Sequence, residues 1–285
     1  MKIVKFVIII FVSLFLQNTY AQEKKGSVRT SFFNENWLNA IVSVETKDKE
    51  NKIYHVGTGF LVQTEKQKVI LVTASHVIKD KENLQYRRID DKNEEILITD
   101  QNLINAGAGK WFFSENYDLA CRIFGWPSDK KTPTVIPIEK SIPVEDIHPG
   151  APLLVLGFPS GLKAEFHNKP LVRQGIVARS EKNKIIIDAF VFPGNSGGPV
   201  VYVPFLKVSG NIKSPLVNEE MLIGVISSYI PYQDKAISPQ TGRTRITFEE
   251  NSGLSEVIPI KAVQDLISRQ DIKKQGDKFI EANKD

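Results

Sequence analysis

PGNSGGP, residues 193–199, places a single serine between glycines. A serine hydroxyl is a weak nucleophile until a neighbouring base takes its proton, and the oxyanion formed on attack needs N–H donors. Flanking glycines permit the sharp turn and the close approach to a substrate that this chemistry requires. We therefore predict that Ser196 is a nucleophile and that the segment Gly194, Asn195 and Ser196 forms an oxyanion hole, mainly through the N–H groups of Gly194 and Ser196. The alternative is a glycine-rich turn with an exposed serine.

The base must come from four histidines, and all of them precede Ser196: His55, His76, His148 and His167. The loop also contains the G-x-S-x-G pattern of the nucleophile elbow of α/β-hydrolases, a fold in which the histidine follows the serine. No histidine follows Ser196 here, so that alternative lacks its base. The strand-rich pattern described below also disagrees with an alternating β/α fold.

His76 is the best candidate for the base because it ends the stretch VILVTASH, residues 69–76. An apolar strand that leads into small residues would hold the imidazole at a strand end, on a rigid scaffold. The surroundings of the other histidines predict ordinary roles. We interpret His55 as a surface or packed residue, His148 as part of a linker turn and His167 as part of a polar loop.

Asp118 is the best candidate for the carboxylate that orients the base. It stands in NYDLA, residues 116–120, at the start of an apolar strand, and a carboxylate that enters a core needs a partner. In a catalytic triad a buried carboxylate fixes the imidazole tautomer and stabilises the imidazolium. The alternative is an aspartate that only caps a turn. Asp188 is the rival carboxylate, but it closely precedes Ser196, and we assign it to the neighbouring strand.

Short runs of Val, Ile, Leu and Phe, bounded by Gly, Pro, Asn and Asp, dominate the chain and predict β-strands. Many short strands with polar turns predict a barrel or sandwich. A helical period of apolar residues occurs at residues 260–270. The predicted strands are residues 57–62, 69–73, 95–99, 118–124, 152–158, 184–191, 200–203, 221–229 and 244–248.

Four prolines in residues 129–149 indicate a linker between two β halves. We expect surface loops at residues 209–220 and 231–253, the second with room for a short strand at residues 243–248. The predicted domains are a signal peptide at 1–21, a first β-barrel at 30–135, a second β-barrel with a C-terminal helix at 136–271, and a frayed polar tail at 272–285.

The N-terminus has the pattern of an export signal: Lys2 and Lys5, an apolar run at residues 6–16, and the small residues Thr19 and Ala21 before the expected cleavage point. The alternative is a membrane anchor, but the run is shorter than the ~20 apolar residues that span a bilayer. We expect an exported protein, periplasmic or secreted, with no stable membrane insertion after signal removal.

The amino-acid composition limits which partners and cofactors we expect. The 37 basic and 33 acidic residues give a net charge of +4, and removal of the leader would bring it closer to zero, so nucleic acid is not an expected partner. Cys121 is the single cysteine, so no internal disulfide can form, and its apolar surroundings favour a buried hydrophobe. With no zinc-type cluster in the sequence, we expect no metal or other cofactor.

The matching motifs GTGFLV at residues 57–62, VTASHV at 72–77, YDLA at 117–120 and PGNSGGP at 193–199 resemble trypsin-like (chymotrypsin-fold) serine peptidases, specifically the bacterial HtrA-like branch. The order His, Asp, Ser is that of the chymotrypsin-type triad. The resemblance runs from about residue 37 to residue 267. It implies an all-β fold of two six-stranded antiparallel β-barrels, with the triad in the cleft between them.

The resemblance also implies acyl-enzyme chemistry on polypeptide substrates. Ser196 would attack the peptide carbonyl, His76 would accept and then donate the proton, and Asp118 would orient His76. The likeness further implies a serine endopeptidase with Phe190 at the floor of the primary pocket, which favours apolar or small side chains. It also implies that Ser227, Ser228 and Tyr229 form the edge that pairs with a substrate backbone.

Two departures from the family change other expectations. Digestive relatives carry aspartate before the serine, where this chain has Asn195, so we expect no zymogen activation by N-terminal cleavage. The residues after the predicted helix are too few for a PDZ module. Two alternative functions remain open, an esterase or acyl transferase with the same triad and a non-catalytic binding module on the protease fold. The sequence does not predict the oligomeric state.

Overall fold

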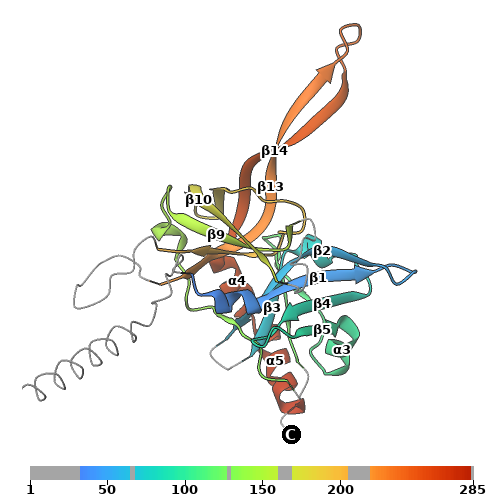
Figure 1. The fold of residues 1–285 in the computed structure, drawn as a ribbon, viewed down its shortest axis with the longest axis vertical. Helices are drawn as coiled ribbons and strands as arrows, with labels where there is room; N and C mark the ends of the chain where they lie inside the picture. The colour runs from blue at the N-terminus through green and yellow to red at the C-terminus, as the bar shows by residue number, and fades with distance from the viewer. Residues whose placement is uncertain (1–32, 65–67, 127–129, 160–168, 205–218, 284–285) are drawn as a thin grey trace, which may run out of the picture. The chain divides into compact units, whose positions relative to one another are not determined.

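The computed structural model of the 285-residue chain describes residues 33–64, 68–126, 130–159, 169–204 and 219–283. The predicted signal peptide at residues 1–21, His167 and most of the expected loop at residues 209–220 lie outside these ranges. The described chain is mostly β and forms two sheets, as the sequence predicts (Figure 1).

The first sheet has eight strands in the order β5-β4-β1-β2-β3-β7-β6, with β8 paired to β2 in parallel. All of its other pairs are antiparallel. It therefore exceeds the expected six strands by two strands of two residues each, β6 and β8. Its elements are η1 (Glu35–Ala40), β1 (Ile41–Lys47), β2 (Ile53–Gln63), β3 (Val69–Thr73), α2 (Ser75–Ile78), β4 (Leu84–Ile89), β5 (Glu95–Thr99), α3 (Asp100–Asn105), β6 (Phe112–Phe113), β7 (Ala120–Ile123) and β8 (Ile136–Pro137).

The second sheet is a closed antiparallel barrel of six strands in the order β10-β11-β14-β13-β12-β9. The linker with η2 (Val144–Asp146) leads into it, and two helices follow it. Its elements are β9 (Pro152–Gly157), β10 (Leu171–Glu181), β11 (Lys184–Asp188), β12 (Pro199–Tyr202), β13 (Met221–Ile237) and β14 (Thr244–Pro259), followed by α4 (Ile260–Ile267) and α5 (Gln270–Ala282).

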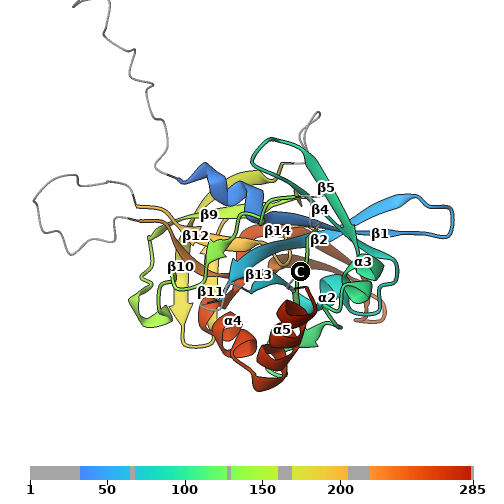
Figure 2. The ribbon, with the colours of Figure 1, turned by 90° about the horizontal axis from the view of Figure 1, so that it is seen from below.

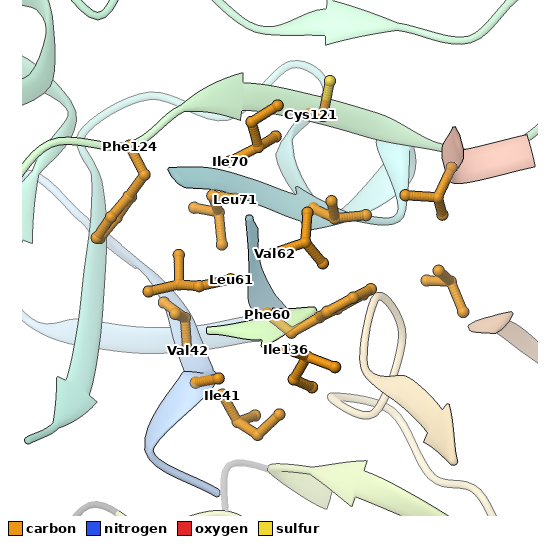
Figure 3. Close-up of a cluster of buried hydrophobic side chains, with 14 of the residues drawn as sticks. Ile41, Val42, Phe60, Leu61, Val62, Ile70, Leu71, Cys121, Phe124 and Ile136 are labelled. Atoms are coloured by element: carbon orange, nitrogen blue, oxygen red, sulfur yellow. The ribbon is translucent and has the colours of Figure 1, made fainter. Parts of the chain in front are cut away.

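The main hydrophobic core joins the two sheets. Strand β3 is buried at all five positions, which explains why its sequence is continuously apolar and does not alternate. Phe60 and Leu61 of β2 lie in this core beside Val42 and Ile136 (Figure 3). Leu156 and other residues of the second sheet belong to the same cluster. The shared core fixes where the strand ends of one sheet meet the loops of the other.

The segment at residues 272–285, expected to be a frayed polar tail, is mainly helix α5, so that expectation was wrong (Figure 2). Ile272 and Phe279 lie seven residues apart on one face of the helix and pack against the main core. The Lys68 ammonium, nearly buried, reaches the Asp277 carboxylate at 2.6 Å. Among the described residues, no helix is long and apolar enough to cross a membrane.

The expected surface loop at residues 231–253 is also corrected, because it forms the outer parts of β13 and β14. The two strands stay paired from Pro231 and Asn251 outward to Ile237 and Thr244. The possible short strand at residues 243–248 is part of this longer pairing. Pro231 and Gly253 at its ends, with Pro239 and Gly242 between them, are typical of a loop and mask the alternating pattern of the paired strands.

Candidate active site

The register of the first sheet brings His76 and Asp118 together. Strand β3 pairs with β7 so that Thr73 lies opposite Ala120, and the residues that flank this pair meet at one end of the sheet. His76 Nδ1 lies 2.5 Å from Asp118 Oδ2, and the His76 amide donates to Asp118 Oδ1 at 2.9 Å. The carboxylate therefore holds the ring so that Nδ1–H faces it and Nε2 remains available as a base.

Asp118 is held as an anion by its surroundings. The hydroxyls of Ser75 and Ser227 donate to its two oxygens, in addition to the bonds from His76. Partial burial opposes ionisation, but the hydrogen bonds from His76 and Ser75 outweigh it, and the pKa of Asp118 lies well below its ordinary value. The carboxylate is thus charged at neutral pH and able to stabilise an imidazolium.

Ser196 lies in the loop between β11 and β12, on a tight turn. The Asn195 amide donates to the Phe192 carbonyl at 3.0 Å, and Gly194 has φ +100°. Proline and glycine at the two central positions are the signature of a type II turn, which needs a positive φ at the second. This turn explains why the sequence reads Pro193-Gly194 shortly before Ser196.

The oxyanion-hole prediction needs one refinement. Within the described ranges, neither the Gly194 amide nor the Ser196 amide donates a hydrogen bond, so both N–H groups remain available. The Asn195 amide, by contrast, is used inside the turn. The Asn195 side chain is 1% exposed, which places it beneath the loop and away from a substrate. If the predicted hole forms, its donors would be the Gly194 and Ser196 amides, and the Asn195 amide would not be one of them.

The Ser196 hydroxyl donates to the Ser227 carbonyl at 3.0 Å. The described structure contains no hydrogen bond between Ser196 and His76. Ser227 links the parts of the site, because its own hydroxyl donates to Asp118 at 3.3 Å. All three predicted triad residues thus contact one another directly or through Ser227. Catalytic hydrogen bonds often form fully only with substrate in place.

Two further residues, not identified from the sequence, hold the Gly194 carbonyl. The Thr58 hydroxyl donates to it at 2.6 Å, and His55 Nε2 lies 3.3 Å away. The Thr58 amide also donates to the Ser196 carbonyl at 2.9 Å. Both residues belong to β2, so the first sheet supports the loop of the second sheet that carries Ser196.

His55 combines this contact with two others. Its ring packs edge-on against Phe158, and its Nδ1 lies 3.0 Å from the Ser43 hydroxyl. The sequence predicts a surface or packed residue at this position, and His55 does pack, but it also reaches the loop that carries Ser196. The alternating pattern around it gave no indication of this contact, which depends on the second sheet.

Of the residues predicted to bind substrate, Ser227, Ser228 and Tyr229 lie along an open strand edge beside Ser196. Strand β13 pairs with β14 through Ser228 and Tyr229, while its contact with the β12 side ends at Ile226. From Ser227 onward, no described strand covers that edge of β13. Phe190 is 55% exposed and lies near Gly253. Their roles in binding remain predictions.

A family model for the trypsin-like peptidase domain matches residues 57–203. No curated protein sequence matches the chain. Among solved structures, human heparin binding protein has a TM-score of 0.51 at 11% identity, with 82% of this chain and 92% of that chain covered. At this identity the likeness shows a shared fold alone.

Two solved bacterial-type protease structures are also similar. The MamO protease domain from Magnetospirillum magneticum has a TM-score of 0.49 and 15% identity, with 81% of this chain and 96% of that chain covered. A variant of the HtrA-type protease AlgW, solved with a tripeptide, has a TM-score of 0.48 and 18% identity. The match covers 82% of this chain and 60% of that one.

Proposed function

Because the chain belongs to the trypsin-like peptidase family, we propose that it is an exported serine endopeptidase that cleaves polypeptides through an acyl-enzyme. The observation that carries the proposal is the pairing of His76 with an ionised Asp118 in one hydrogen-bonded cluster with Ser196. A base, its orienting carboxylate and a hydroxyl between glycines are the parts that acyl transfer needs. The N–H groups of Gly194 and Ser196, which donate no hydrogen bond within the described residues, supply the donors for the oxyanion.

The proposed reaction begins when the Ser196 hydroxyl turns from the Ser227 carbonyl to His76 Nε2. Ser196 Oγ then attacks the scissile carbonyl as His76 takes its proton, and the charge of Asp118 stabilises the imidazolium. The N–H groups of Gly194 and Ser196 bind the oxyanion. His76 passes the proton to the leaving amine, which leaves an ester on Ser196. Water, deprotonated by His76, then hydrolyses this ester and restores the hydroxyl.

The open edge of β13 is the observation that favours a polypeptide as the substrate. An extended chain can add to an uncovered strand through main-chain hydrogen bonds, which are indifferent to side-chain identity. Ser227 to Tyr229 offer such an edge directly beside Ser196. Phe190 adds an exposed apolar surface next to Gly253. We therefore propose an apolar or small side chain before the scissile bond, with Tyr229 narrowing the neighbouring subsite.

The proposal of export rests on the pattern of residues 1–21. N-terminal sequencing of the protein recovered from the producing cells tests it. A mature chain that begins near Gln22 outside the cytoplasm is expected. An intact N-terminus on a cytoplasmic protein would contradict it.

Hydrolysis of casein and of a small p-nitrophenyl ester tests the enzymatic proposal. The purified protein is compared with Ser196→Ala and with Ser268→Ala, a matched loss of a hydroxyl at the exposed end of α4. We expect wild type and Ser268→Ala to cleave both substrates and Ser196→Ala to cleave neither. Ester cleavage without casein cleavage would favour the esterase alternative. A folded wild type inactive on both would favour the binding module.

A further inference from the structure

The outer part of the β13–β14 hairpin, residues 231–251, is here called the ribbon. Figure 1 shows it projecting from the second barrel in orange. Its strands pair from Pro231 and Asn251 to Ile237 and Thr244, and both are exposed along their length. No other described strand pairs with the ribbon. An isolated two-stranded hairpin is only marginally stable in water, so the ribbon, which extends from two barrel strands without a third element, would gain stability from an added strand.

The edge of β14 is the more open of the two ribbon edges. Strand β14 pairs with β11 only from Leu254 onward, so residues 246–251 present main-chain groups with no strand partner on that side. The edge of β13 carries Pro231 and Lys235, which are features that discourage strand addition. The β14 edge has neither residue type. A register shift at Arg245 lies at its outer end and leaves the rest regular.

The sequence of this edge is complementary to itself. Residues 245–249 read RITFE. In an antiparallel pair of two such strands centred on Thr247, Ile246 of each copy lies opposite Phe248 of the other. Arg245 likewise lies opposite Glu249. Opposite charges and apolar groups at facing positions are the pairs that stabilise antiparallel strands.

The charges and apolar groups of the edge have few partners within one chain. Among the described residues, neither Arg245 nor Glu249 forms an ion pair, and Glu249 accepts one hydrogen bond, from Gln233. Ile246 and Phe248 are 55% and 54% exposed. They share one face of the ribbon because they are two residues apart. A second copy would satisfy both charges and bring four apolar side chains together.

We propose that two copies of this chain associate through the β14 edges of their ribbons, antiparallel about Thr247, to form a four-stranded sheet. The arrangement is a closed twofold dimer in which each surface meets itself. Antiparallel pairing places the two barrels at opposite ends of the joined ribbons. This dimer does not depend on the proposed peptidase activity.

Cysteine crosslinking tests the position of the twofold axis. In Thr247→Cys the two new thiols face each other across the axis, at the close spacing of cross-strand neighbours. The native Cys121 is fully buried and does not compete. Under mild oxidation we expect Thr247→Cys to form a covalent dimer. The matched control Thr244→Cys, on the same strand but opposite Glu250 in this register, should stay largely monomeric. Absence of crosslinking in Thr247→Cys, or equal crosslinking in both, would overturn the proposed pairing.

A charge swap tests the pairs themselves by sedimentation velocity across a concentration series. Arg245→Glu and Glu249→Arg should each raise the dimer dissociation constant by about tenfold or more. The twofold symmetry repeats each substitution in both copies, so both Arg245–Glu249 pairs are lost at once. The combined swap should restore wild-type association. Lys182→Glu, in the exposed turn between β10 and β11, should leave it unchanged. Circular dichroism verifies that every variant folds.

Two results would overturn the proposal. One is a wild type that stays monomeric at every concentration reached. The other is protection of the β14 edge amides from hydrogen exchange by an added extended polypeptide while the protein remains monomeric. In that case the edge binds a peptide and not a second copy.

Discussion

Thr58 supports the proposed nucleophile loop through both its side chain and its main chain. Its buried hydroxyl donates to the Gly194 carbonyl at 2.6 Å and accepts from the Phe158 amide at 3.1 Å. Its own amide donates to the Ser196 carbonyl. Thr58→Val keeps the shape and the main-chain bond but removes both bonds of the hydroxyl. The variant therefore isolates what the side chain contributes to the loop.

The loss of stability in Thr58→Val follows from the polar groups that lose the hydroxyl as a partner. The Phe158 amide becomes a buried donor without this acceptor, while the Gly194 carbonyl keeps its contact with His55. A buried polar group that loses its partner costs about 1–3 kcal/mol. We expect the free energy of unfolding to fall by about 2–4 kcal/mol, and Tm to fall by roughly 5–15 °C for a protein of this size.

Activity should fall as well. A loosened Gly194 aims its N–H less well at the oxyanion, and the loss of one such donor costs about 100-fold to 1000-fold in kcat. Because Thr58→Val weakens the support without removing the donor, we expect a loss of roughly tenfold to 100-fold in kcat with KM little changed.

Calorimetry and steady-state peptide hydrolysis measure the two effects side by side. Thr58→Ser is the matched control, because it retains the hydroxyl and loses only a methyl group. We expect it to stay close to wild type in kcat. A Thr58→Val enzyme with wild-type Tm and wild-type kcat would refute the reasoning that this hydroxyl supports the loop.

Three further predictions concern the triad carboxylate and the C-terminal helix. Asp118→Asn should lower kcat by about 10⁴ with a small change in KM, measured by peptide hydrolysis, because the wrong imidazole tautomer is then held; a loss under tenfold would contradict this. Since hydrogen bonds hold the pKa of Asp118 below its ordinary value, its charge stabilises the fold above about pH 4 and this contribution disappears as the pH falls further. The stability difference between wild type and Asp118→Asn in urea should therefore shrink from pH 6 to pH 2, and a constant difference would argue against it. Ile272→Ala, at a side chain 1% exposed, should cost about 2–5 kcal/mol in urea unfolding, whereas no change would mean that α5 does not pack as described.

The sequence was informative where chemistry or periodicity is local. The glycines around Ser196 anticipate the turn, and their positive φ values explain why other residues would be strained there. The apolar run before His76 correctly predicts β3, and the single helical period correctly predicts α4. Because all four histidines precede Ser196, the sequence also argues against the α/β-hydrolase fold.

Contacts between distant segments were not predictable in the same way. Thr58 and His55 acquire their roles only where the first sheet meets the loop of the second. The sequence of α5 is mostly polar because much of the helix surface is exposed. Only Ile272 and Phe279 mark the face that packs against the core. In the ribbon, proline and glycine mark the ends of a paired segment and not an irregular loop.

The central claim is that His76 and Asp118 activate the hydroxyl of Ser196. Mass spectrometry of the protein after reaction with a fluorophosphonate, followed by peptide mapping, tests it most directly. We expect a single adduct on Ser196 that forms rapidly in wild type, slowly in His76→Ala and not at all in Ser196→Ala. A folded wild type without an adduct, or an adduct on another residue that persists in Ser196→Ala, would contradict the account.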